Sequence, residues 1–177
     1  ELHRLYALPA TAAPDAAAPK PRLVSADGQV RSLCLTLTGR ASWDDLSLVW
    51  RGVQADLDWP APAIAVTGVD GHQLWFSLAQ AVPAAEGAAL LAGLRARYLG
   101  NAHLARLRLW PAGDAASLRP ATAPKLPPAE PAPGRWSAFV APDLAAVFAD
   151  EPWLDLPPGA DAQADLLAGL RSIAPED

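Results

Sequence analysis

The spacing of apolar residues between positions 30 and 110 changes from every second residue to every third or fourth residue and back, and it does so twice. Alternation predicts a strand with one buried face, whereas the longer spacing predicts a helix with one buried face. The chain should therefore form a strand, a helix, two strands, a helix and a strand. We predict the strands at Val30–Thr38, Ala63–Thr67, His72–Leu78 and Leu104–Trp110, and the helices from Ser42 and from Pro83.

This order is the split βαβ arrangement of ferredoxin-like and RNA-recognition-motif folds, in which two helices cover one face of the sheet. The expected fold class is therefore α+β, with a βαββαβ core followed by a C-terminal strand and helices. Ser42, followed by Asp45, has the spacing of a capping box at a helix N-terminus, and Asp70-Gly71 is typical of a hairpin turn. Beyond the core, we predict a strand at Trp136–Val140, a short helix at Asp143–Ala149 and a final helix at Asp161–Ile173.

Two proline-rich stretches lie outside this pattern. Four prolines between positions 9 and 21 prevent a helix despite the neighbouring alanines, so residues 1–29 are expected to form a Pro- and Ala-rich N-terminal extension. Seven prolines between positions 111 and 134 predict a long loop. We therefore expect a single domain at residues 30–177 that carries a Pro-rich loop at residues 111–134.

The charge and cysteine content exclude several classes of function. Fourteen Lys and Arg against nineteen Asp and Glu give a net charge of −5, which argues against a broad basic surface for nucleic acid. The single cysteine, Cys34, excludes an intramolecular disulfide and a multi-cysteine zinc site. No apolar run reaches the roughly 18 residues of a membrane span, and the N-terminus lacks a secretory signal pattern. We expect a cytoplasmic protein with no membrane contact.

Alternation also predicts which side chains lie on the sheet face away from the two helices. They are Cys34, Thr36 and Thr38 from the first strand, Gln73, Trp75 and Ser77 from the third, and Arg106 and Arg108 from the last. This face should be polar and partly basic, with no carboxylate. His72 is one position out of phase with it and should point towards the helices. Cys34 is interpreted as a small buried side chain and not as a nucleophile.

Several segments have the order and spacing of motifs found in one known family. They are Leu33–Gly39, Val66–Leu78, Leu107–Pro111, Lys125–Pro128, Gly134–Val140 and Asp150–Leu154. Together they resemble archaeo-eukaryotic-type primase-polymerases (the AEP-like or prim-pol-like superfamily), which include the polymerase domain of bacterial end-joining ligases. The family's first strand typically reads apolar-Asp-apolar-Asp-Gly, where this chain has Leu35, Thr36, Leu37, Thr38 and Gly39. The resemblance spans roughly residues 30–156.

The resemblance implies a site from which the catalytic groups have been lost. The family binds two divalent metals through two first-strand aspartates and a third carboxylate, and these positions are Thr36, Thr38 and Arg108 here. The nucleotide-contacting Ser and His of the family fall on Thr67 and Gln73. Divalent metals of this kind need oxygen ligands, chiefly carboxylates, so the resemblance implies no catalytic residue, no metal and no cofactor. The residues left as a degenerate nucleotide- or anion-binding site are Thr36, Thr38, Thr67, Gln73, Trp75 and Arg108.

Three functions remain open at this point. The first is an inactive primase-polymerase-like domain that binds a nucleotide or single-stranded nucleic acid weakly, with Trp75 stacking on a base and the Arg108 guanidinium holding an anion directly. In the alternative interpretation, Arg108 pairs with an acid of the C-terminal segment. The second function is a scaffold whose tryptophans and Pro-rich loop dock a protein partner. The third is an active nucleotidyltransferase whose metal ligands have moved to other acids, with candidates at Asp44, Asp45, Asp143, Asp150 and Asp155.

Overall fold

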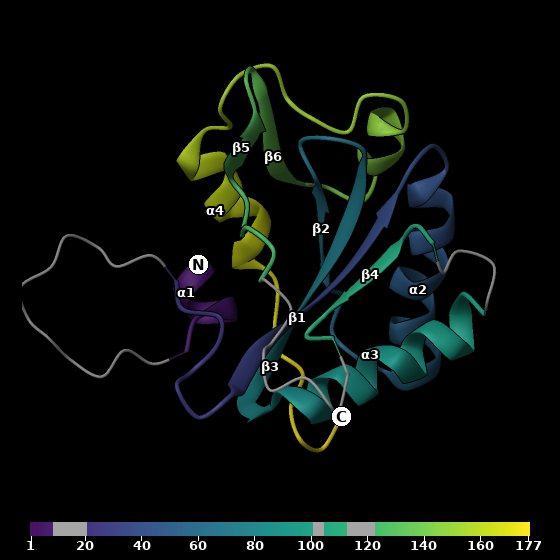
Figure 1. Ribbon diagram of the computed structural model, residues 1–177, viewed down its shortest axis with the longest axis vertical. Helices are drawn as coiled ribbons and strands as arrows, with labels where there is room; N and C mark the ends of the chain where they lie inside the picture. The colour runs from purple at the N-terminus through teal and green to yellow at the C-terminus, as the bar shows by residue number, and fades with distance from the viewer. Residues whose placement is uncertain (9–20, 101–104, 113–122) are drawn as a thin grey trace, which may run out of the picture.

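The computed structural model of the chain describes residues 1–8, 21–100, 105–112 and 123–177. These residues form an α+β fold in which six strands make an antiparallel sheet of order β4-β1-β3-β2-β6-β5 (Figure 1). The strands are β1 (Gln29–Thr38), β2 (Ala63–Val66), β3 (Gly71–Pro83), β4 (Leu107–Trp110), β5 (Ala129–Ala132) and β6 (Arg135–Val140). The helices are α1 (Leu2–Tyr6), α2 (Ser42–Leu57), α3 (Ala84–Tyr98), α4 (Ala160–Ala168) and the 3-10 helix η1 (Ala145–Phe148).

Helices lie on both sides of the sheet (Figure 1). On one side, α2 packs against β1 and β3, and α3 packs against β1, β3 and β4. On the other side, α1 contacts β1 and β3, whereas α4 contacts β6. Among the described residues, the helices on this second face contact β1, β3 and β6.

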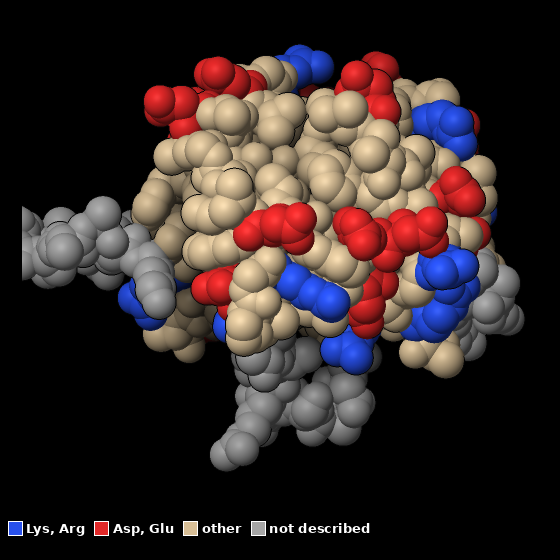
Figure 2. Space-filling model, turned by 90° about the horizontal axis from the view of Figure 1, so that it is seen from above, with Lys and Arg blue, Asp and Glu red and all other residues tan. Residues whose placement is uncertain are grey.

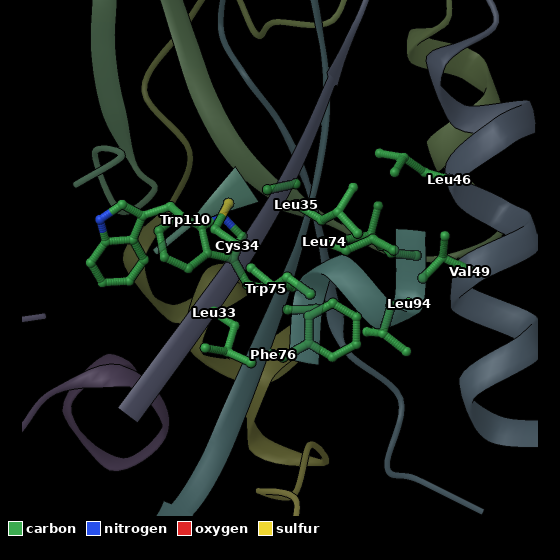
Figure 3. Packing of buried hydrophobic residues seen from close by; sticks show 14 of the residues in the cluster. Leu33, Cys34, Leu35, Leu46, Val49, Leu74, Trp75, Phe76, Leu94 and Trp110 are labelled. Atoms are coloured by element: carbon green, nitrogen blue, oxygen red, sulfur yellow. The ribbon is translucent and has the colours of Figure 1, made fainter. Parts of the chain in front are cut away.

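The core lies between the sheet and the pair α2 and α3. Leu33, Leu35 and Leu37 alternate along β1 towards these helices and are fully buried, as the spacing predicts. Figure 3 shows Leu35 and Leu74 pointing towards α2, with Cys34 and Trp110 on the opposite side of β1. The described residues also follow the predicted order of elements from β1 to β4, because alternation and helical spacing each bury one apolar face.

Strand β3 is longer than predicted at its C-terminal end, since it continues to Pro83. The C-terminal segment pairs with its second half: the Ile173 N–H donates to the Ser77 carbonyl at 2.8 Å, and the Ala79 N–H donates to the Ile173 carbonyl at 2.8 Å. At its other end, β3 begins at Gly71, where a Cβ atom would collide with the Leu37 carbonyl oxygen of β1. Glycine is required there by this close approach of two backbones.

Helix α2 begins differently from the predicted capping box. The N-cap residue is Ala41, in the left-handed conformation with φ of 61°, and its methyl side chain makes no capping hydrogen bond. Ser42 is the first helical residue, and its hydroxyl lies 2.7 Å from Nδ1 of the buried His72. The capping prediction was therefore wrong, because a long-range partner takes the hydroxyl that would otherwise have bonded the local backbone.

The N-terminal residues belong to the folded domain, although the sequence assigned residues 1–29 to an extension. Leu5 and Tyr6 of α1 are among the most buried side chains, and Leu23 joins the same apolar cluster. Arg4 fixes the helix by donating to the carbonyl oxygens of Leu167 at 2.9 Å and Leu170 at 3.0 Å. Most of the predicted linker, residues 9–20, lies outside the described residues.

The tail differs in detail from the prediction. Within the expected loop at 111–134, residues 129–132 form β5, which pairs with β6, while residues 113–122 lie outside the described part. The predicted short helix is the 3-10 helix η1, and the final helix ends at Ala168 instead of Ile173. In the described part of the chain, no helix has the length and apolar character that crossing a membrane requires.

Candidate functional site

A pocket of about 810 Å³ lies on the partly covered face of the sheet. Its polar lining residues are Thr36, Thr38, Thr67, Asp70, Gln73, Arg108, Lys125 and Ser137. Its apolar walls come from Val69, Leu109, Trp110 and the segments around Pro124 and Pro131. Five of the six residues predicted for a degenerate anion site therefore line one cavity, and the sixth, Trp75, does not.

Strand register explains why these side chains meet. Thr36 of the central strand β1 lies opposite Gln73 of β3 on one side and opposite Arg108 of β4 on the other. Directly opposed residues of antiparallel strands place their side chains on the same face, about 5 Å apart. The three side chains consequently form a row across the floor of the pocket.

A chain of hydrogen bonds fixes part of this floor. The Trp75 indole N–H donates to Gln73 Oε1 at 3.0 Å, and Gln73 Nε2 donates to Thr36 Oγ1 at 3.3 Å. Thr36 Oγ1 is also 3.6 Å from Cys34 Sγ. Cys34 is buried, and burial raises the pKa of its thiol to about 12, so the group stays neutral. This agrees with the expectation that Cys34 fills space and is no nucleophile.

Trp75 is not available to stack on a ligand, which corrects the prediction made for it. Its side chain is fully buried, and the Tyr6 ring packs edge-on against it with centroids 5.7 Å apart. Tyr6 also stacks on Phe139 at 6.1 Å. The surface on which a base would have stacked is therefore occupied by α1 of the same chain.

Two of the threonines are already engaged by the backbone. Thr67 Oγ1 accepts hydrogen bonds from the N–H groups of Val69, Asp70 and Gly71, at 3.1, 3.0 and 3.0 Å. It therefore shapes the hairpin turn and has only its hydroxyl proton left for a ligand. The Thr38 hydroxyl donates to the Arg106 carbonyl at 3.3 Å, so this side chain is also held in place.

Arg106 does not join Arg108 in a basic row, as alternation along the last strand predicted. It precedes β4, and its guanidinium donates to the Thr38 carbonyl at 3.1 Å. Arg108 is exposed, and no described residue forms a hydrogen bond or an ion pair with its guanidinium. The C-terminal segment from residue 123 onwards, which is described throughout, supplies no acidic partner, contrary to the alternative interpretation of Arg108.

Sequence reasoning missed two charged groups of the pocket. They are Lys125 and Asp70, which both line it, so the face does carry a carboxylate. Lys125 has no ion-pair partner among the described residues. Lys125 reaches the pocket through tertiary structure, and no local sequence pattern predicts its position there. Asp70 was interpreted as a turn residue, which it is, but the same turn forms the rim of the pocket.

His72 lies on the helix side of the sheet, as its phase predicted, and takes no part in the pocket. Its Nε2 is 2.9 Å from the Ala145 carbonyl oxygen, which can only accept a hydrogen bond, so Nε2 carries the proton. Nδ1 then accepts from the Ser42 hydroxyl. Burial is the main cause that lowers the pKa of His72, which favours this neutral form.

Relocated metal ligands were one of the open hypotheses. Across the described ranges, no three His, Cys, Asp or Glu side chains come together in a group that could hold a metal ion. Asp150, one of the candidates, forms an exposed ion pair with Arg40. Comparison with protein-family models, with curated proteins and with solved structures finds no match. The pocket is therefore the feature from which a function can be inferred.

Proposed function

We propose that this chain is a non-catalytic domain of primase-polymerase ancestry that binds a small phosphate-bearing ligand, such as a nucleotide, directly through Arg108. The element order and the strand order β4-β1-β3-β2 support the ancestry, because a split βαβ fold has two crossing helices on one face of such a sheet. Fold alone does not specify function, so the pocket chemistry has to carry the rest of the proposal.

The observation that carries the proposal is the Arg108 guanidinium, which lines a ligand-sized pocket and has no hydrogen-bond or ion-pair partner among the described residues. Ligand pockets typically enclose about 300–1,000 Å³, and this pocket, at about 810 Å³, falls within that range. The planar guanidinium of Arg108 presents several donors that match phosphate oxygens. The Thr36 hydroxyl lies in the same lining and accepts from Gln73 Nε2, so its proton can be donated to the ligand. The Ser137 hydroxyl already donates to the Ala129 carbonyl at 3.1 Å.

The same residues are unsuited to metal-dependent phosphoryl transfer. Two-metal catalysis clamps the attacking and leaving oxygens between cations held by carboxylates. At the three corresponding positions this chain has Thr36, Thr38 and Arg108, and a guanidinium repels a metal ion while attracting the anion that the metal would have bridged. We therefore infer direct anion binding in place of catalysis.

The proposal favours a single small ligand over a nucleic-acid strand. Stacking surfaces for successive bases usually come from exposed aromatic side chains, but α1 covers Trp75. Figure 2 shows acidic side chains lying among the basic ones over one end of the molecule, so the basic groups visible there form no continuous track. Affinity for single strands should accordingly be weak.

Calorimetric titration with ATP, GMP and inorganic phosphate at low salt tests the proposal. We expect measurable binding, and at least a tenfold loss of affinity in Arg108→Ala, because a hydrogen bond to a charged group contributes about 1.5–3 kcal/mol. Arg95→Ala, on α3 and hence on the other side of the sheet, is the matched control and should bind like the wild type. If the wild type binds none of these ligands, or if Arg108→Ala binds equally well, the proposal fails and the protein-docking scaffold remains.

A second experiment separates binding from catalysis. Incubation with a primed template, nucleotides and Mn²⁺ should give no extension above a buffer control, because the lining offers a single carboxylate, Asp70, among its described residues. Extension that depends on Asp70 or on Asp44 would instead support the relocated-ligand hypothesis.

A further inference from the structure

A second cavity, of about 720 Å³, lies beside the first and shares a wall with it. The shared wall is formed by Pro124, Lys125 and Ala129, which line both cavities. The rest of the second cavity is formed by α1 and the segment that precedes β1 on one side, and by residues 123–128 on the other.

The two cavities differ in chemistry. The first is lined by hydroxyls, an amide and three charged side chains. The described lining of the second contains one polar side chain, Lys125; all other lining residues are Leu, Val, Ala or Pro. Its hydrocarbon walls include Leu2, Leu23, Val24 and Leu126. An apolar group that enters this cavity is stabilised by removal of its surface from water, and among the described lining residues only Lys125 offers a side-chain hydrogen bond.

Lys125 places one positive charge at the wall that the two cavities share, in a described lining that is otherwise apolar. Its side chain is exposed and forms no ion pair with a described acid. A lysine of this kind can lay its methylene stem on the apolar wall while its ammonium group stays at the edge. The complementary ligand is a molecule with one anionic end and one hydrocarbon end.

We propose that this second cavity binds a single-chain anionic amphiphile, with its hydrocarbon chain against Leu23, Val24 and Leu126 and its carboxylate or phosphate head group on Lys125. This site goes beyond the proposed function, because it requires neither Arg108 nor a nucleotide. The head group lies at the wall shared by the two cavities, so an occupant of one cavity would change the charge seen by an occupant of the other.

Titration with decanoate, dodecanoate and tetradecanoate below their critical micelle concentrations tests the inference. Each added methylene should raise the affinity about fourfold, which follows from the transfer free energy of a buried CH₂ group. Dodecanol, which has the same chain without the charge, should bind at least tenfold more weakly than dodecanoate. Affinity that does not depend on chain length, or equal affinity for dodecanol, would overturn the proposal.

Two variants separate the charge from the cavity. Lys125→Glu should weaken dodecanoate binding at least tenfold, whereas Arg22→Glu, an exposed charge reversal outside the cavity lining, should have no effect. Ala123→Leu fills part of the cavity without changing its charge and should weaken binding at least fivefold. Unchanged melting temperatures establish that the variants fold. Wild-type affinity in both Lys125→Glu and Ala123→Leu would refute the site.

Arg108→Ala distinguishes the two proposals. Dodecanoate should bind this variant with an affinity within twofold of the wild type, whereas the affinity for ATP should fall at least tenfold. Either proposal can therefore fail while the other holds.

Sedimentation with vesicles of phosphatidylglycerol and phosphatidylcholine separates a free amphiphile from a membrane surface. We expect the protein to stay in the supernatant, and co-sedimentation that dodecanoate does not compete away would show that a bilayer is the true partner.

Discussion

The docking of α1 against the sheet can be tested by truncating Tyr6. Its side chain is 1% exposed and its ring contacts those of Trp75 and Phe139. Replacing a buried aromatic side chain with alanine costs about 3–5 kcal/mol, and aromatic pairs contribute about 0.5–1.5 kcal/mol beyond area burial. With two such pairs, we expect Tyr6→Ala to lose about 4 kcal/mol of unfolding free energy.

Urea unfolding followed by circular dichroism measures this loss. With a typical denaturant dependence of about 2 kcal/mol per molar urea, the midpoint should fall by about 2 M. Tyr6→Phe is the matched control, since it keeps both ring contacts, and its midpoint should fall by less than about 0.5 M. A loss below about 1 kcal/mol in Tyr6→Ala would refute the reasoning, because it would mean that α1 leaves the sheet at little cost.

Three further predictions follow from single contacts. Gln163→Leu should lose about 2–4 kcal/mol in urea unfolding, because its amide satisfies both the Phe139 N–H at 2.7 Å and the Phe139 carbonyl at 3.0 Å, and a buried unpaired group costs about 1–3 kcal/mol; a loss below about 0.5 kcal/mol would contradict this. The pKa of His72 is lowered in the folded state, so the unfolded chain takes up the proton first as pH falls below about 6.5. The unfolding free energy should therefore decline on acidification. His72→Gln should reduce the slope of that decline with pH, and an unchanged slope would contradict this prediction. Cys34, with a pKa raised by burial to about 12, should react with a thiol reagent at pH 8 only as fast as the protein unfolds, and rapid labelling under native conditions would be the contrary result.

Much of the sheet could be predicted from the sequence, because its information is local. The period of two of Leu33, Leu35 and Leu37 predicts a buried face of the strand, and the same period places Thr36 on the other face. Once β1, β3 and β4 are adjacent, alternation puts Gln73 and Arg108 on the same face as Thr36. The site floor was therefore within reach of sequence reasoning, although the ligand was not.

The features that were missed depend on contacts between distant residues. Tyr6 belongs to a five-residue helix that is too short to be stable alone. The helix forms because it packs against β1 and β3 of the sheet. Lys125 reaches the pocket through the path of an irregular segment. Ser42 gives its hydroxyl to His72, thirty positions away, and not to the helix backbone. None of these contacts can be predicted from the periodicity of apolar residues in the sequence.

The way α1 is held also affects how the chain folds during synthesis. Arg4 bonds the Leu170 carbonyl, 166 positions further along the chain. At about 5–20 residues per second, a ribosome needs on the order of 10 to 30 s to make that interval. Through this period Leu5 and Tyr6 have emerged, but the carbonyl groups that anchor their helix do not yet exist. Leu5 and Tyr6 therefore stay exposed throughout this interval, and their helix can be anchored only after Leu170 has been made.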